Sequence, residues 1–132
     1  MFGRPISFCL GFSEINVGKT QIQGQRGEKL AAEYLQKQGL KIIAKNVRTP
    51  FGELDLVCKK GANWIFVEVK ARNSKTFGNP EDALLGNKLG RLKQSIDWFV
   101  STRNLSQAYQ LDALLIENPE KAPKFLWLKN IS

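Results

Sequence analysis

The sequence contains no histidine. This absence removes the commonest general base and the commonest protein ligand for zinc, copper and iron, and it leaves carboxylates and backbone carbonyls as the available metal ligands. Oxygen-only coordination is typical of magnesium or manganese. Cysteine is nearly as scarce, with only Cys9 and Cys58. They are not spaced as a redox or zinc pair, and Cys58 fits an inward strand position, so we predict two free thiols.

Long apolar runs are also missing. No run approaches the length needed to cross a membrane, and the apolar piece at residues 6–12 lacks the length and the small-residue cleavage site of a secretory signal. We therefore expect a cytoplasmic protein with no membrane partner. A length of 132 residues suits one core and is too short for two ordinary domains. We place a single domain in residues 24–132, and residues 1–23 stay open between an added strand, a partner-binding arm and a disordered tail.

Acidic residues are few relative to basic ones. The chain has 12 Asp and Glu against 20 Lys and Arg, which gives a formal net charge of +8 and a pI near 9.7. This excess favours a polyanionic partner, and nucleic acid is the first candidate. Anionic lipid is the weaker alternative, because no single basic amphipathic helix stands out.

What the sequence does contain is a group of acids and lysines between Phe51 and Lys70. Apolar and polar residues alternate there in two runs joined by a turn at residues 60–63, which predicts two adjacent strands. If their polar faces align, Asp55 lies near Glu68 and Lys70. Carboxylates placed side by side need a cation to neutralise them, so the pattern predicts a metal site. Within each strand the apolar residues are expected to share one face: Leu54, Leu56 and Cys58 in the first, Val67 and Val69 in the second.

Each part of this pattern has a simpler interpretation, because a Glu-x-Lys on a strand is ordinarily a solvated face. The repeat favours a site, since the first strand carries Glu53 and Asp55 on its own polar face and a basic loop follows the second. A further acid, Glu28, lies in a predicted helix, on the edge of the face that should turn inward. It belongs to the same site or it only complements the helix macrodipole, and the local sequence leaves both open.

The rest of the chain predicts a mixed α/β domain with a sheet flanked by helices, in the order helix, three strands, helix, two strands. The first helix covers residues 25–38 and stops at Gly39. The second begins with a capping signal at residues 79–82 and continues to about Asn104; Gly86 and Gly90 weaken its first half, so its regular part begins at Asn87. The other strands cover residues 40–48, 110–117 and 125–129. The buried stripes are Ala31, Tyr34 and Leu35 in the first helix, and Leu85, Leu89, Leu92, Ile96 and Phe99 in the second.

Several separated motifs occur in one order over roughly residues 24–117: GQRGEKLAAEYL, NVR, GELDLV, FVEVKAR, Phe77-Gly78 and Lys88. In this combination the sequence resembles the YraN-like family of endonuclease-like proteins. That family is similar in turn to the restriction-endonuclease-like PD-(D/E)xK nucleases, and its helix-borne Glu is similar to that of the archaeal Holliday junction resolvases. The departures are modest. No Pro precedes Asp55, where the motif's name would put one, and Ala71 stands where the family commonly has Thr.

The resemblance implies a restriction-endonuclease-like fold in which Asp55 and Glu68 bind the metal and Lys70 is the lysine of the motif. Glu28 is the additional acid of the resolvase-like branch. The Val69 carbonyl is a further candidate ligand. By analogy with resolvases, which act as symmetric pairs, a homodimer is expected.

The expected function is that of a Mg²⁺- or Mn²⁺-dependent endonuclease that hydrolyses phosphodiester bonds in DNA, with branched or junction DNA as a candidate substrate. Divalent ions can activate the water, neutralise charge on the transition state and stabilise the leaving oxygen. Lys70 would orient or help deprotonate the water, or stabilise the developing charge. Glu53 would support the ligands from outside or be merely exposed. A phosphate-binding rim, or else a solvated face, is formed by Arg72, Lys75, Lys88, Arg91 and Lys93.

The alternative is a non-catalytic nucleic-acid-binding module on the same fold. Its affinity would come from lysine and arginine contacts to phosphates and would depend strongly on salt. The carboxylates would then play no part in binding.

Overall fold

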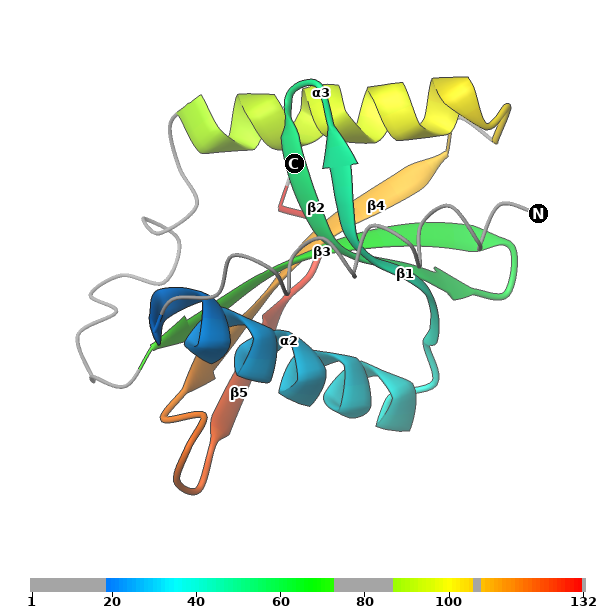
Figure 1. The fold of residues 1–132 in the computed structure, drawn as a ribbon. Coiled ribbons are helices and arrows are strands. Elements are labelled where there is room, and N and C mark those ends of the chain that lie inside the picture. Colours follow the sequence, from blue (N-terminus) through cyan, green and yellow to red (C-terminus); the bar gives the residue numbers. More distant parts are fainter. Residues whose placement is uncertain (1–18, 73–86, 106–107, 132) are drawn as a thin grey trace.

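A five-stranded mixed sheet forms the centre of the protein in the computed structural model, which describes residues 19–72, 87–105 and 108–131. The strands lie in the order β1-β2-β3-β4-β5, and β3 and β4 are parallel whereas the other neighbours are antiparallel. Helix α2 lies on one side of the sheet and helix α3 on the other (Figure 1). The elements are α2 (Lys19–Lys37), β1 (Lys41–Thr49), β2 (Gly52–Lys60), β3 (Asn63–Arg72), α3 (Asn87–Thr102), β4 (Tyr109–Glu117) and β5 (Lys124–Leu128).

The predicted α/β class, with helices flanking a sheet, is confirmed, and some element bounds differ. Helix α2 begins at Lys19, before the predicted start at residue 25, and α3 is described from Asn87. The predictions for residues 1–18 and 73–86 lie outside the described residues, among them those for Cys9, Lys75, Leu85 and the capping signal. Cys58 is a buried free thiol, as expected. Neither of the two described helices is long and apolar enough to cross a membrane.

Each face of the sheet buries its own apolar core under one helix. Beneath α3 the core contains Ala44, Val47, Leu54, Val57, Trp64, Phe66, Leu92, Ile96, Phe99, Val100 and Leu111. Beneath α2 it contains Ala31, Ala32, Leu35, Leu40, Leu56, Cys58, Ile65, Val67, Leu114 and Ile116. Each large apolar side chain buried in this way contributes about 1.5–3 kcal/mol, so both helices are held firmly against the strands. The helix stripes are confirmed within the described residues, with Tyr34 only half-buried and stacked on Phe125 at a ring distance of 4.4 Å.

Strand β2 does not keep one face along its length. Leu54 packs under α3, whereas Leu56 and Cys58 pack under α2, so the prediction that these three share a face was wrong for Leu54. The reason is the irregular stretch between them. The β2–β3 ladder ends at the pair Leu56 and Val67, and opposite this stretch of β2 the residue Asn46 of β1 has a positive φ of 51°. Regular alternation requires a continuous pleat, and here the pleat is interrupted.

The far edge of the sheet is fixed by a buried carboxylate. Asp112 of β4 is fully buried, and its oxygens accept hydrogen bonds from the Trp127 indole N–H at 2.8 Å, the Asn130 backbone N–H at 3.0 Å and the Gln110 side-chain amide at 2.9 Å. These donors satisfy a group that would otherwise be costly to bury. They attach β5 and the residues after it to β4, which lies directly beside β3.

Two glycines shape helix α2. Gly39 has a φ of 96°, and the Leu40 N–H donates to the Leu35 carbonyl at 3.0 Å, which confirms the predicted C-terminal cap. Gly27 is buried where α2 crosses β3, and a Cβ atom placed on it would lie 2.7 Å from the Ala71 Cβ. Since the Ala71 Cβ is fixed to the strand backbone, only a glycine permits this close approach. The approach brings the next residue, Glu28, over the sheet.

Gly27→Ala is therefore expected to lower the free energy of unfolding by about 1–3 kcal/mol, because the added methyl group forces α2 away from β3. The matched control is Gly90→Ala in α3, where an added Cβ would meet nothing within 4 Å. That change should raise the free energy of unfolding by about 0.5–1 kcal/mol through helix propensity. Urea unfolding of the two variants checks this, and equal effects of the two substitutions would contradict the close approach.

Candidate metal centre

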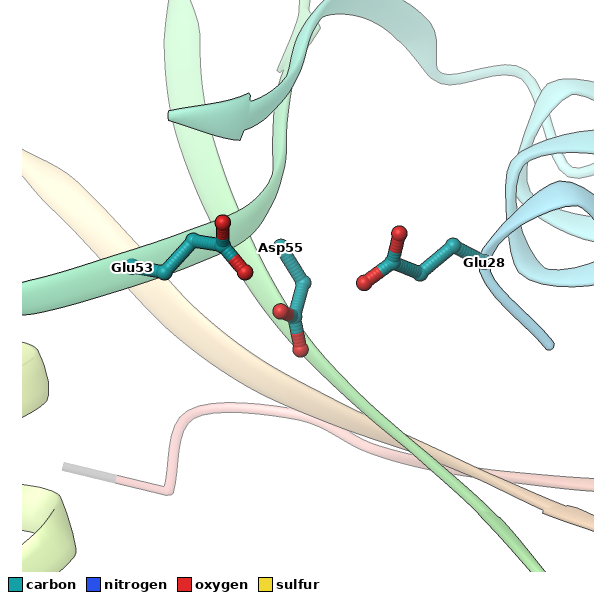
Figure 2. A group of neighbouring side chains, drawn as sticks. All are labelled: Glu28, Glu53 and Asp55. Atoms are coloured by element: carbon teal, nitrogen blue, oxygen red, sulfur yellow. The ribbon is translucent and has the colours of Figure 1, made fainter. Parts of the chain in front are cut away.

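Three carboxylates from two elements meet at the irregular stretch of β2. One oxygen from each of Glu28, Glu53 and Asp55 lies within 4.8 Å of the others. Glu28 extends from α2 toward the sheet, and Glu53 and Asp55 extend from β2 toward the same point (Figure 2). Oxygens that share one octahedral Mg²⁺ are at most about 4.2 Å apart, so this group is close to the size that one ion requires.

Asp55 is held by the backbone of β3. Its Oδ2 atom accepts a hydrogen bond from the Val69 N–H at 2.9 Å. This bond lies just past the last ladder pair, Leu56 and Val67, so the carboxylate takes the place that a β2 carbonyl would occupy in a continuing ladder. The N–H and the carbonyl of one strand residue point to the same edge, and the Val69 carbonyl therefore also faces β2.

Glu68 lies beside this group and is neutralised from the other helix. It is 5% exposed, and its Oε2 lies 2.7 Å from the Nζ of Lys88 on α3. Alternation along β3 explains the direction, since Phe66 packs under α3 and Glu68 lies two residues further on. Lys70 is half-buried in the same strand and interacts with Lys88.

Burial and nearby negative charge raise the pKa values of Glu28, Glu53 and Asp55. Burial raises the pKa of Glu28 to about 7, against a lowering effect of its hydrogen bond with the Asn46 side chain. Burial, then the charge of Glu68, raises the pKa of Asp55 well above its usual value, although the Val69 N–H acts in the opposite direction. Burial also raises the pKa of Glu53, and the nearby Arg48 partly offsets this. The charges and donors of the chain thus do not fully stabilise these groups as anions.

Lys88 responds in the complementary way. Burial acts to lower the pKa of its ammonium group, but the hydrogen bond and the charge of Glu68 outweigh burial and raise that pKa. Lys88 therefore stays charged and cancels one carboxylate. The remaining acids need protons or an added cation, and a set of carboxylate oxygens with one facing carbonyl matches the ligands of Mg²⁺ or Mn²⁺.

The predicted site residues are brought together in large part. Carboxylate oxygens of Glu28 and Asp55 lie within 4.8 Å of each other, and the charge of Glu68 raises the pKa of both. Lys70 interacts with Lys88, which in turn pairs with Glu68. In the predicted phosphate rim, Lys88 and Arg91 line a cavity beside the acids and Lys93 is exposed on α3. Arg72 is the last residue of β3, and Lys75 lies outside the described residues.

Two residues have a larger part than the sequence analysis gave them. Glu53 was interpreted as a supporting or exposed group; it is exposed, and its carboxylate is also one of the three that meet. Asn46 was treated only as a strand residue, and its side chain binds the carboxyl of Glu28. Both stand within the family motifs, NVR and GELDLV, and this was the only signal available before the strands were placed in space.

Matches to known proteins cover most of the chain. The sequence model of the "Uncharacterised protein family UPF0102" matches residues 27–116. A UPF0102 protein of Shewanella loihica is 37% identical over 108 residues, which are 82% of this chain and 91% of that protein. One of Syntrophomonas wolfei is 54% identical over 72 residues, 54% of this chain and 63% of that protein. One of Shewanella sediminis is 39% identical over 107 residues, 81% of this chain and 88% of that protein. The match to the family contains all four acids of the site.

In the absence of divalent ions, the free energy of unfolding is expected to fall as the pH rises from about 4.5 to about 7. The folded pKa of Glu28, about 7, lies above its ordinary value of 4.5, so the folded state binds more protons in this window and loses stability as they leave. Glu28→Gln cannot ionise and should be more stable than the wild type at pH 8. Thermal unfolding in a chelator between pH 5 and pH 8 measures both effects.

The control is Glu33→Gln, an exposed acid on the same helix, which should keep the wild-type pH dependence. Mn²⁺ added at pH 8 should raise the midpoint of the wild type and of Glu33→Gln by a few degrees, and that of Glu28→Gln by less. Identical pH profiles for all three proteins would show that the pKa of Glu28 is not raised in the folded state.

Proposed function

Because the chain belongs to the uncharacterised protein family UPF0102, also called the YraN family, we propose that it is a metal-dependent endonuclease that cleaves DNA. The observation that carries the proposal is the meeting of Glu28, Glu53 and Asp55 beside a buried Glu68, in a chain of net charge +8. Placing carboxylates that repel one another side by side costs free energy, and a bound hard cation would offset that repulsion. The positive charge around them suits a polyanionic substrate.

The fold that goes with this activity is the restriction-endonuclease-like one. Three features support it: a mixed sheet between two helices, a β2–β3 pair that separates at Asp55, and Glu68 and Lys70 on the strand that follows. In this arrangement the acids of the motif stand at or just past the end of the β2–β3 ladder. The resemblance of the motifs to those of the PD-(D/E)xK nucleases supports the same fold.

The proposed ligands are Asp55, Glu68 and the Val69 carbonyl, with Glu28 and Glu53 completing the set directly or through water. A bound Mg²⁺ or Mn²⁺ would activate water and offset the negative charge of the phosphate. Asp55 can hold its position because the Val69 N–H fixes one of its oxygens. Asn46 does the same for Glu28. Such fixed ligands keep the cost of reorganising the site low.

The lysines have separate roles in this proposal. Lys70 would orient the attacking water or stabilise developing charge. Lys88 neutralises Glu68 in the metal-free protein, and its side chain is 43% exposed, so it can turn outward when a cation takes over this task. It is then free to contact a phosphate, together with Arg91 and Lys93. Branched or junction DNA is the substrate that the likeness to resolvases favours.

A second candidate, a nucleic-acid-binding module without catalysis, is favoured by the net charge and by the exposed cations Arg91 and Lys93 on α3. In that case binding depends on salt and not on the carboxylates. Titration with Mn²⁺ separates the two candidates. Binding that is lost in Asp55→Asn supports the nuclease, and no binding of Mg²⁺ or Mn²⁺ supports the module.

Asp55→Asn is expected to lower the rate of metal-dependent cleavage by about 100-fold or more, because a fixed anionic ligand is lost. DNA binding should stay equal or become tighter, since local negative charge decreases. Cleavage of duplex, single-stranded, flap and junction DNA with Mg²⁺ or Mn²⁺ measures the first effect, and fluorescence anisotropy measures the second. Asp97→Asn is the matched control, an exposed aspartate on α3 whose loss should change neither. Absence of cleavage by the wild type on every substrate would refute the nuclease proposal.

Lys88→Met is expected to bind Mn²⁺ several-fold more tightly than the wild type, because Glu68 loses the ammonium group that competes for it. The same variant should bind DNA more weakly, with a salt slope reduced by about one charge. Calorimetric titration with Mn²⁺ and anisotropy at several salt concentrations measure the two effects.

The control here is Lys93→Met, an exposed lysine of the same helix. It should weaken DNA binding without any effect on Mn²⁺. If both lysine variants bind Mn²⁺ with the wild-type affinity, the ion pair of Lys88 does not compete with the metal.

A further inference from the structure

A cavity of about 470 Å³ lies between the β1–β2 turn and helix α3. It is contiguous with the metal centre, because Glu53 belongs to both and Lys88 joins the cavity wall to Glu68. Its volume falls in the range of sites that hold small organic ligands. The lining residues are Phe51, Gly52, Glu53, Lys88, Arg91, Leu92 and Ser95.

Phe51 is the unusual member of this lining. It is 42% exposed, and among the described residues the only other exposed large apolar side chain is Leu126 on β5. A single exposed aromatic side chain is ordinary on a protein surface, but Phe51 lines a cavity next to the candidate site, where the exposed part of its ring is accessible to a ligand. Its position is at the rim of the acid group and not on a remote surface.

Hydrogen bonds fix the turn that carries Phe51. The Phe51 N–H donates to the Thr49 hydroxyl at 3.1 Å, and this hydroxyl donates to the Gly52 carbonyl at 2.8 Å. The Ser95 hydroxyl of α3 lies 2.8 Å from the Thr49 oxygen. Because the only proton of Thr49 is used on Gly52, Ser95 is the donor in that contact. The turn is thus tied to the helix, and the ring is presented from a fixed support.

The wall combines one aromatic ring and two cations with the Glu53 carboxylate on the side of the acids. A flat apolar ring suits Phe51, and an adjacent anion suits Lys88 and Arg91. A nucleotide carries both groups. A base inside a continuous duplex has both faces covered by its neighbours, so it has no free face to offer Phe51. An unpaired base has one, and stacking on aromatic side chains is the general way in which proteins hold such bases.

We propose that this cavity binds an unstacked base of DNA, with Phe51 stacked on the base and Arg91 on a neighbouring phosphate. The inference rests on the proposed function, since it places this nucleotide next to the phosphate at the metal centre. It adds a substrate class: DNA with unpaired nucleotides, such as single strands, flaps and open junctions, is preferred over a continuous duplex.

The test measures binding in a chelator, where no cleavage occurs, by fluorescence anisotropy with a single-stranded oligonucleotide and with its duplex. Phe51→Ala is expected to weaken binding of the single strand by about 5- to 100-fold and to change binding of the duplex by less than about twofold. Phe51→Leu keeps an apolar group of similar size without a π-face and should behave like Phe51→Ala. Phe51→Trp keeps an aromatic face and should bind the single strand with an affinity close to that of the wild type.

The matched control is Leu126→Ala, which removes the other exposed apolar side chain and should change neither affinity. Equal weakening on both DNAs, or no weakening on the single strand, would overturn the proposal. The nuclease proposal fails separately, through absent cleavage by the wild type. If Asp55→Asn abolishes cleavage and Phe51→Ala leaves single-strand binding intact, only the base-binding cavity is refuted.

Discussion

The hydrogen bond from the Val69 N–H to Asp55 is the interaction on which the site depends. It lies where the β2–β3 ladder has just ended, so a side chain occupies a position that the backbone would otherwise fill. This one hydrogen bond therefore satisfies a backbone N–H of β3 and holds the Asp55 carboxylate in position at the same time. If this acid were replaced by an apolar residue, the Val69 N–H would lose its partner at a partly buried position. Fold and site share this one bond, and neither is independent of the other.

The sequence predicted the elements better than the directions of their side chains. Alternation in β3 was sufficient to put Glu68 and Lys70 on one face, and the stripes of Leu35 and Ile96 identified the buried sides of both helices. The alternation failed at Leu54, because period two assumes an unbroken pleat and β2 turns between Leu54 and Leu56. A positive φ at Asn46 is compatible with the side chain of asparagine but is not dictated by it. The residues around this break in alternation do not predict it.

The composition of the site was only partly accessible for the same reason. Glu28 was left open between a helix-dipole role and a site role, because the sequence does not show how closely α2 approaches β3. Gly27 permits this approach, since its missing side chain lets the helix pass within contact distance of Ala71, and Glu28 then lies near the other acids. Glu53 joins the acids while staying exposed, and its side chain extends from β2 toward those of Asp55 and Glu28 (Figure 2). The motifs therefore pointed to acids that lie close together in the structure, whereas their grouping depends on contacts between elements that the sequence does not show.

Asp112 links the strand beside the acid group to the segment that follows β4. In the parallel β3–β4 pair it stands beside Val67, one residue before Glu68. Its hydrogen-bond donors Trp127 and Asn130 come from the C-terminal segment. Because both donors follow β4 in the sequence, a chain cut just before β5 would leave the Asp112 carboxylate without two of its three donors. Such a truncated chain would bury an unsatisfied carboxylate directly beside Val67, the neighbour of Glu68 on β3.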